Sequence, residues 1–281
     1  MKLDSQIDSP VLPRPDQTTV LELGLQSCTL SDWLAIDADL PQFHAHKLEQ
    51  FETHKHEVFA ALPESEPAQA EFGQVLLADL LRTHGERYHC DNKFLRARNS
   101  GLKWSLTELS LDACSLWIQE DICLMQQFGG EHILTAASLC SPTNWRLNEK
   151  IGHNLNVIHD PVPGYGTKLQ ERVNRMLSQM SDNKLILRYN WSLQQGSELC
   201  WRPDLHAIDP ADQLFWRVER QTLRRLPQTG AIVFGIRIYL ESLAQLETRA
   251  PGSRNSIRKL IANLDSQQRA YKGLDSLLAL V

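Results

Sequence analysis

Hydrophobic residues recur at helical spacing in two segments within the first hundred residues. The first segment runs from Pro41 to Leu62, and its apolar markers are Phe43, Leu48, Phe51, Val58 and Phe59. The second begins at Ser65, where Pro67 suits the first turn of a helix, and continues to about His84. Its apolar face holds Phe72, Val75, Leu76, Leu80 and Leu81. The spacing therefore predicts an antiparallel pair of helices.

After about residue 115 the pattern changes to the alternation that is typical of β-strands. Five strands are expected, at residues 115–128, 131–139, 184–193, 213–223 and 230–240. The first two are joined by a turn at Gly129 and Gly130, and a partly helical stretch at 144–180 separates them from the other three. Two strands, a helical middle and three strands form the element order of a PAS-type domain. The pattern therefore predicts an α+β protein with an antiparallel sheet.

The same pattern suggests how the chain is divided. Residues 1–19 are polar and proline-rich and are expected to form a flexible arm. A helical N-terminal subdomain is expected at 20–100, a PAS-like core at 101–250 and C-terminal helices at 251–281. Because 281 residues can bury one large core, we expect 20–281 to form one compact unit.

The composition of the chain limits the cellular environment and the classes of partner that we expect for the protein. The formal net charge of −5 argues against nucleic acid, because no overall basic field gathers phosphates. No apolar run approaches the roughly 20 residues that span a membrane, and the acidic N-terminus lacks the apolar centre of a signal peptide. The six cysteines include no C-x-x-C pair, which excludes zinc ribbons and thioredoxin motifs. We therefore expect a cytosolic, cytoplasmic protein with reduced thiols and no membrane contact.

Candidate chemistry is concentrated between Cys140 and Tyr165. This stretch carries two histidines, His153 and His159, and a stiff Pro-Val-Pro-Gly corner follows the second one. A histidine beside a stiff corner is held in position, as a metal or cofactor ligand must be. The alternative interpretation is a buried histidine that hydrogen-bonds to the backbone. Four more histidines lie on the first predicted helix, but none of them are four residues apart, so a metal site is not expected there.

Several motifs resemble the family of haem-dependent oxidative N-demethylases. They are Ser-Pro-x-x-Trp at 141–145, Glu-Lys-Ile-Gly at 149–152, Ile-His-x-Pro-Val-Pro-Gly-Tyr at 158–165, Arg-Tyr-Asn-Trp at 188–191, and the block from Glu219 to Pro227. The resemblance covers roughly residues 20 to 250. It implies a PAS-like haem protein, with haem b between the helical middle and the sheet.

The resemblance also implies roles for particular residues. His159 would be the iron ligand, because it falls on the family motif, and His153 is the rival. Tyr165 belongs to the same motif, and Arg188, Asn190 and Arg237 would face the cofactor from the sheet. Strand alternation places Arg188 and Asn190 on one side of their strand.

Two further residues are the candidates for catalysis. Arg224 could stabilise negative charge on bound dioxygen, and Glu219 could hold a cationic amine. The alternative is structural, since cross-strand Glu–Arg pairs are common in sheets. If the Glu219–Arg225 block were structural, the site would lie around Arg188, Asn190 and Arg237.

The function implied by the resemblance is oxygen-dependent demethylation of a small secondary or tertiary amine. The sequence shows no phosphate loop, dinucleotide fingerprint or nucleophile elbow, and no flavin or nicotinamide module. NADPH and flavin would therefore act only through a partner reductase. A haem-based gas or redox sensor and a haemless PAS-like interaction module are the alternative functions.

Overall fold

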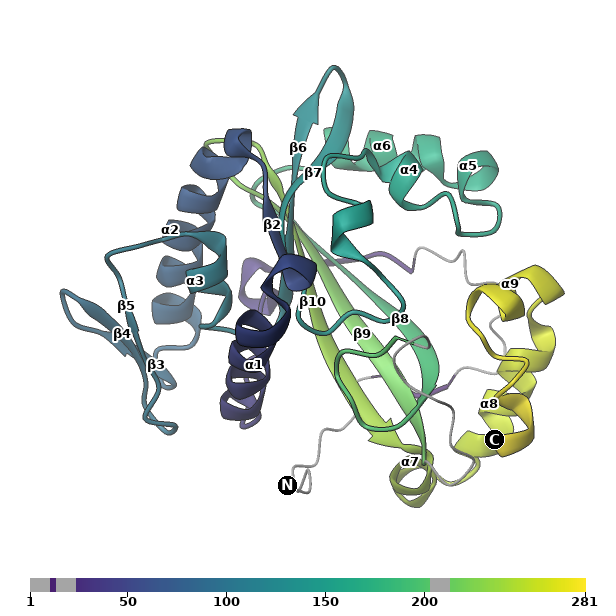
Figure 1. Ribbon diagram of the computed structural model, residues 1–281. Coiled ribbons are helices and arrows are strands. Elements are labelled where there is room, and N and C mark those ends of the chain that lie inside the picture. Colours follow the sequence, from purple (N-terminus) through teal and green to yellow (C-terminus); the bar gives the residue numbers. More distant parts are fainter. Residues whose placement is uncertain (1–10, 14–23, 203–212) are drawn as a thin grey trace.

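The computed structural model describes residues 11–13, 24–202 and 213–281. At its centre is a seven-stranded antiparallel sheet with strand order β1-β8-β9-β10-β6-β7-β2 (Figure 1). Its strands are β1 (Gln26–Cys28), β2 (Phe59–Ala61), β6 (Asp121–Phe128), β7 (Glu131–Ser138), β8 (Leu185–Gln195), β9 (Leu214–Arg225) and β10 (Ile232–Ser242). A separate three-stranded sheet contains β3 (Tyr88–Cys90), β4 (Phe94–Ala97) and β5 (Lys103–Ser105). The described chain is therefore an α+β protein.

The helices are distributed around the large sheet. In chain order they are α1 (Leu40–Val58), α2 (Glu66–Thr83), α3 (Leu111–Ser115), α4 (Leu155–Ile158), α5 (Tyr165–Lys168), α6 (Gln170–Ser178), α7 (Leu243–Arg249), α8 (Ser253–Asn263) and α9 (Ser266–Tyr271). Short 3₁₀ turns occur at Leu30–Asp32, Pro63–Ser65, Leu147–Glu149 and Leu278–Leu280. In Figure 1, α2 and α3 lie on the side of the small sheet, α4–α6 lie at the opposite side, and α9 lies beside β8.

The register of the three long strands fixes which side chains share a face. Asn190 of β8 lies opposite Glu219 of β9, which lies opposite Ile238 of β10. Since cross-strand partners point to the same side, these three residues share one face of the sheet. Tyr189 and Arg220, one position away, point to the other. We call the first side the α4 face and the second the α2 face, after the helices that cover them.

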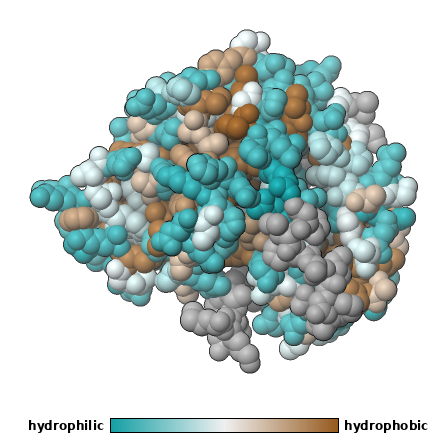
Figure 2. Space-filling view, viewed as in Figure 1, coloured by the Kyte–Doolittle hydropathy of each residue, from teal (hydrophilic) through white to brown (hydrophobic). Residues whose placement is uncertain are grey.

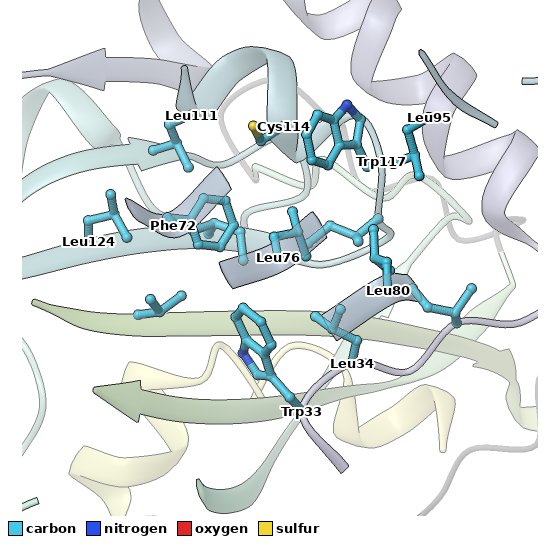
Figure 3. Packing of buried hydrophobic residues seen from close by; sticks show 14 of the residues in the cluster. Trp33, Leu34, Phe72, Leu76, Leu80, Leu95, Leu111, Cys114, Trp117 and Leu124 are labelled. Atoms are coloured by element: carbon cyan, nitrogen blue, oxygen red, sulfur yellow. The ribbon is translucent and has the colours of Figure 1, made fainter. Parts of the chain in front are cut away.

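The α2 face carries the largest hydrophobic core. Phe72 and Leu76 of α2 pack with Trp33 and with Val233 of β10 in one cluster. Figure 3 shows how Trp33, Phe72 and Leu76 converge beside the strands, with Trp117 and Leu95 nearby. At the other end of the same strands, α7–α9 bury a second cluster around the stacked rings of Trp191 and Trp216. Together these two clusters cover the α2 face.

The α4 face is covered less completely. Leu155 and Ile158 of α4 pack with Leu223 of β9. Phe234 and Ile236 of β10 belong to the edge of this cluster, yet both keep partial exposure in the middle of the sheet. A central strand normally buries such side chains, so solvent enters here between the helices and the sheet. Figure 2 shows the outer surface in the view of Figure 1; the small sheet at its left is largely hydrophilic.

Most elements expected from the pattern are present. The two early helices, the last four long strands and the C-terminal helices all form close to their expected bounds. Residues 115–120 are not part of a strand, however, because α3 ends there and the strand begins at Asp121. The first helix ends at Val58, and the apolar residues after it form β2, which pairs with β7. The three strands between 88 and 105 were not expected.

Two further expectations concern the N-terminal arm and contact with a membrane. The predicted arm at 1–19 lies outside the described residues except for 11–13, where the carbonyl of Val11 accepts a hydrogen bond from Trp216 Nε1 at 3.1 Å. In the described ranges, every helix is too short or too polar to cross a bilayer.

Candidate functional site

Local hydrogen bonds fix the backbone around His159. The side chain of Asn154 caps α4 by accepting a hydrogen bond from the Val157 amide at 3.0 Å. The amide of His159 continues this turn to the carbonyl of Leu155 at 3.0 Å. After the prolines, Gly164 adopts a φ of +76°, which an L side chain rarely tolerates, and α5 begins at the next residue. The predicted stiff corner is confirmed, with glycine at the position that requires it.

The side chain of His159 is held by two contacts. Its Nδ1 lies 2.8 Å from the carbonyl oxygen of Leu155, and its ring stacks on Tyr165 at 4.5 Å with an interplanar angle of 13°. A carbonyl oxygen only accepts, so Nδ1 carries the proton and Nε2 keeps its lone pair. Nε2 makes no hydrogen bond to any residue that the structure describes and is not fully enclosed. His159 therefore presents a free nitrogen in the tautomer of a metal ligand.

The surroundings also keep this imidazole neutral. Burial lowers the pKa of His159; the hydrogen bond to the Leu155 carbonyl opposes this, and the weaker effects of the positive charges on Arg188 and Lys150 lower the pKa further. Leu155 and Ile158 of α4 pack with Leu223 of β9, so His159, which follows this helix, lies on the same side of the sheet as Arg188 of β8. A neutral imidazole is the form that binds iron.

The rival ligand His153 is placed differently. Its backbone is paired, because its carbonyl accepts from the Leu134 amide at 3.0 Å and its amide donates to Lys150 at 3.1 Å. Its side chain is exposed, on the outer side of this turn. The geometry thus favours His159 over His153 as a ligand for a group enclosed between helix and sheet.

Arg188 is an unpaired cation on the α4 face. Among the described residues it has no hydrogen bond and no ion pair, and its Nε is fully enclosed. Burial lowers the pKa of Arg188, and the charge of Glu219 opposes this effect only from a distance. A half-buried guanidinium whose Nε is enclosed without a partner is costly, which makes it an indicator of a ligand site.

Glu219 is held in place but has one free oxygen. Its Oε2 accepts hydrogen bonds from Asn190 Nδ2 at 3.1 Å and from Gln221 Nε2 at 2.7 Å. Its Oε1 has no partner among the described residues. The two amides orient the carboxylate without neutralising it. Glu219 can therefore accept a hydrogen bond from a cation that enters the same space.

The structure does not bring Arg224 and Arg237 to this group. Arg224 lies on the α2 face, where it forms an ion pair of 3.5 Å with Asp79 of α2 and lies 4.2 Å from the ring centroid of Trp33. Arg237 also points to the α2 face and donates to Asp37 at 2.8 Å. The structure thus groups His159, Tyr165, Arg188, Asn190 and Glu219, and separates them from the other two arginines by the sheet.

Sequence reasoning missed two residues beside this group, Tyr271 and Lys272. Both end the C-terminal helix α9, and the Lys272 ammonium donates to Asn190 Oδ1 at 3.3 Å and to the carbonyl of Trp191. Nothing in the local sequence distinguishes this lysine from a surface residue. Its role depends on how α9 packs against β8.

The donor set fits a haem better than a free metal ion. Within the described ranges no three His, Cys, Asp or Glu side chains converge on one point. Haem iron needs only one protein ligand on its proximal side, which a single imidazole provides. The partly exposed Phe234 and Ile236 offer an apolar surface beside that imidazole. His159 would hold the iron, and these residues suit contact with a porphyrin.

A comparison with protein families agrees with this arrangement. The family described as haem-dependent oxidative N-demethylase, alpha subunit-like, matches residues 24–280. The match includes α4, the three long strands and also α8 and α9, which lie beyond the motifs seen in the sequence. The chain therefore belongs to the family of proteins like the alpha subunit of haem-dependent oxidative N-demethylase.

Proposed function

We propose that this chain binds haem b through His159 and removes a methyl group from a small secondary or tertiary amine. The porphyrin would lie between α4–α5 and the α4 face of the sheet, within a PAS-like core formed by β6–β10 and the helices α4–α6. The observation that supports this proposal is that two unused groups lie on the α4 face, the free Nε2 of His159 and the unpaired Arg188.

Each residue of the group has a role in this proposal. Leu155 and Tyr165 fix the orientation of the His159 ring and leave its Nε2 available to a ligand. Glu219 receives the protonated amine on its free Oε1, while Asn190 and Gln221 keep the carboxylate oriented. A desolvated carboxylate attracts a methylammonium ion strongly, because little water screens the interaction.

Arg188 would take the role that the sequence suggested for Arg224. Its guanidinium lies on the same face of the sheet as Asn190 and has hydrogen-bond donors to spare. Such a cation stabilises negative charge that develops on oxygen during reduction. Haem, when bound, supplies the oxygen chemistry. Dioxygen, two electrons and two protons would be consumed per methyl group; one oxygen atom would leave in formaldehyde, the other as water, and the demethylated amine would be released.

The electrons must come from another protein. The description of the family as alpha subunit-like supports the presence of further components. We propose a reductase that carries NADPH and flavin as this partner.

Haem titration tests the iron ligand. The apoprotein is titrated with haemin, and the Soret band is followed for wild type, His159→Ala and His153→Ala. We expect His159→Ala to weaken binding by at least tenfold or to change the ferric spectrum, since it removes the axial ligand. His153→Ala serves as the matched control and should resemble wild type. An unchanged spectrum and affinity in His159→Ala would exclude this ligand.

The reaction is tested separately by formaldehyde release. Haem-loaded protein is supplied with dioxygen, a ferredoxin–reductase pair with NADPH, and a panel of methylated amines. We expect formaldehyde from at least one amine, and a large loss of this product in Glu219→Gln. If haem binds through His159 but no amine is demethylated with any electron donor, the proposed reaction is wrong.

A further inference from the structure

The C-terminal helix α9 places the ammonium group of Lys272 beside Asn190 of the candidate site. The Lys272 ammonium donates to Asn190 Oδ1 at 3.3 Å and to the carbonyl of Trp191, and it lies 4.6 Å from the centroid of the Trp191 ring. The residue is half-buried. Lys272 thus lines the site, although in the sequence it is about 50 residues away from Glu219 and Gln221.

The contact with Asn190 determines how the amide is turned. An ammonium group only donates, so it requires the amide oxygen, Oδ1. The amide nitrogen, Nδ2, is then directed to Glu219 Oε2, 3.1 Å away. Lys272, Asn190 and Glu219 therefore form a chain of hydrogen bonds with one polarity. Without the lysine, the amide could rotate and point its oxygen at the carboxylate, which would repel it.

The charges around Lys272 act on Glu219 as well. The pKa of Lys272 is lowered to about 8, mainly by burial; the charge of Glu219 opposes this effect and that of Arg188 adds to it. The other charged or titratable groups that face Glu219 are Arg217 and Tyr271. Burial raises the pKa of the Tyr271 hydroxyl. Arginines stay protonated and this tyrosine stays neutral near pH 8, so among these groups Lys272 changes its charge there.

Loss of this proton leaves the hydrogen bonds intact. A neutral amine still has two N–H groups, and Lys272 has two acceptors, Asn190 Oδ1 and the Trp191 carbonyl. Deprotonation therefore removes the positive charge and retains the orientation of Asn190. The two effects of the lysine can be separated experimentally.

We infer that Lys272 is a positioning residue for substrate binding: it orients Glu219 through Asn190, and its charge sets how strongly Glu219 attracts a cationic amine. This inference rests on the proposed role of Glu219. It predicts that the affinity for a permanently charged amine increases as Lys272 loses its proton. Removal of one like charge near a partly screened site corresponds to roughly tenfold in affinity.

The probe for this effect is tetramethylammonium, which carries a charge that does not depend on pH. Its dissociation constant is measured by calorimetry on the haem-loaded protein between pH 6.5 and 9.5. We expect wild type to bind about tenfold more tightly above pH 8 than below it. Lys272→Arg should bind weakly at every pH, since its charge is permanent, and Lys272→Met should show no pH dependence. Lys259→Met, an exposed position on α8, should behave as wild type.

The orienting effect is measured at pH 9.5, where the wild-type lysine is neutral. Lys272→Gln, which can donate a hydrogen bond without a charge, should then bind the probe more tightly than Lys272→Met. In turnover at the same pH, where the variant differs from wild type only in the lost orientation of Asn190, Lys272→Met should raise KM for the amine and leave kcat nearly unchanged.

The results that would refute the inference about Lys272 differ from those that would also refute the proposed function. Binding of the probe with the same pH dependence in wild type and Lys272→Met would refute the inference and leave the demethylase proposal standing. The same conclusion follows if amines are demethylated but the probe binds independently of pH in wild type. If wild type neither binds the probe nor demethylates an amine, the inference and the proposed function both fail.

Discussion

Two arginines on opposite faces of one sheet should respond in opposite ways to the same substitution. Arg224 is paired and packed on the α2 face, and Arg188 is unpaired on the α4 face. If the α4 face holds the site, Arg224→Ala should cost stability and Arg188→Ala should cost function. The comparison is well controlled, because both changes remove the same side chain from neighbouring strands.

The magnitude for Arg224→Ala follows from its partners. Its ion pair with Asp79 is almost fully enclosed, with side-chain exposures of 11% and 2%. Breaking such a pair costs about 3–5 kcal/mol when the remaining charge has no other partner. Asp79 keeps a second partner, Arg82 at 2.7 Å, which reduces the loss. The contact with Trp33 contributes about 1 kcal/mol. We expect a net loss of about 2–3 kcal/mol in the free energy of unfolding.

Arg188→Ala should behave differently. Because Arg188 makes no hydrogen bond or ion pair within the described residues, its removal should change the free energy of unfolding by less than about 1 kcal/mol. Formaldehyde release should fall by at least about tenfold, if Arg188 stabilises charge on oxygen.

Both variants can be measured by urea denaturation of the apoprotein, together with haem affinity and amine turnover. The loss in Arg224→Ala corresponds to a drop in Tm of about 2–4 °C for each kcal/mol. The reasoning is refuted if Arg224→Ala keeps its stability and loses turnover, or if Arg188→Ala unfolds at clearly lower urea while retaining full turnover.

Three further substitutions test individual contacts. Tyr165→Phe should leave haem affinity unchanged and stability within about 1 kcal/mol, because the enclosed hydroxyl has no partner, whereas Tyr165→Ala should weaken haem binding roughly tenfold in the same titration. His132→Leu should raise the free energy of unfolding by about 1–2 kcal/mol in urea, since both ring nitrogens are buried without partners. Because burial lowers the pKa of His132, this gain should grow as the pH falls below about 6.5. Burial alone would raise the pKa of Asp37, but Arg237 and the Gln119 amide hold it below its usual value, so Asp37→Asn should lose stability at neutral pH in thermal melts. That loss should vanish as the pH falls through the native pKa, below about 3.9.

The elements of the fold were largely predictable from the pattern of the sequence. Alternation located the long strands and correctly put Arg188 and Asn190 on a common side. Period-2 alternation is a local property, so it can be read without knowledge of the partner strands.

The choice of face could not be predicted in this way. Whether Glu219 or Arg224 meets His159 depends on the pairing of Asn190 with Glu219 and on the side of the sheet that α4 covers. Both depend on contacts between residues far apart in the chain, which no local pattern contains. Lys272 was missed for the same reason, since α9 reaches Asn190 across 82 positions in sequence. The edge strands β1 and β2 are three residues each, which is too short for a periodic signal.

The register also explains why the block from Glu219 to Arg225 mixes charges of both signs. Between Glu219 and Arg225, residues alternate between the two faces of β9, so neighbouring charges serve different surroundings. Arg220 donates to the carbonyls of Trp33 and Asp32 and fastens the N-terminal segment to the α2 face, while Glu219 and Gln221 form the hydrogen-bonded pair on the α4 face. A substitution in this block therefore has an effect that depends on whether its position is odd or even. Positions 219 and 221 should alter ligand binding, and 220 and 224 should alter stability, although all four belong to the same six-residue stretch.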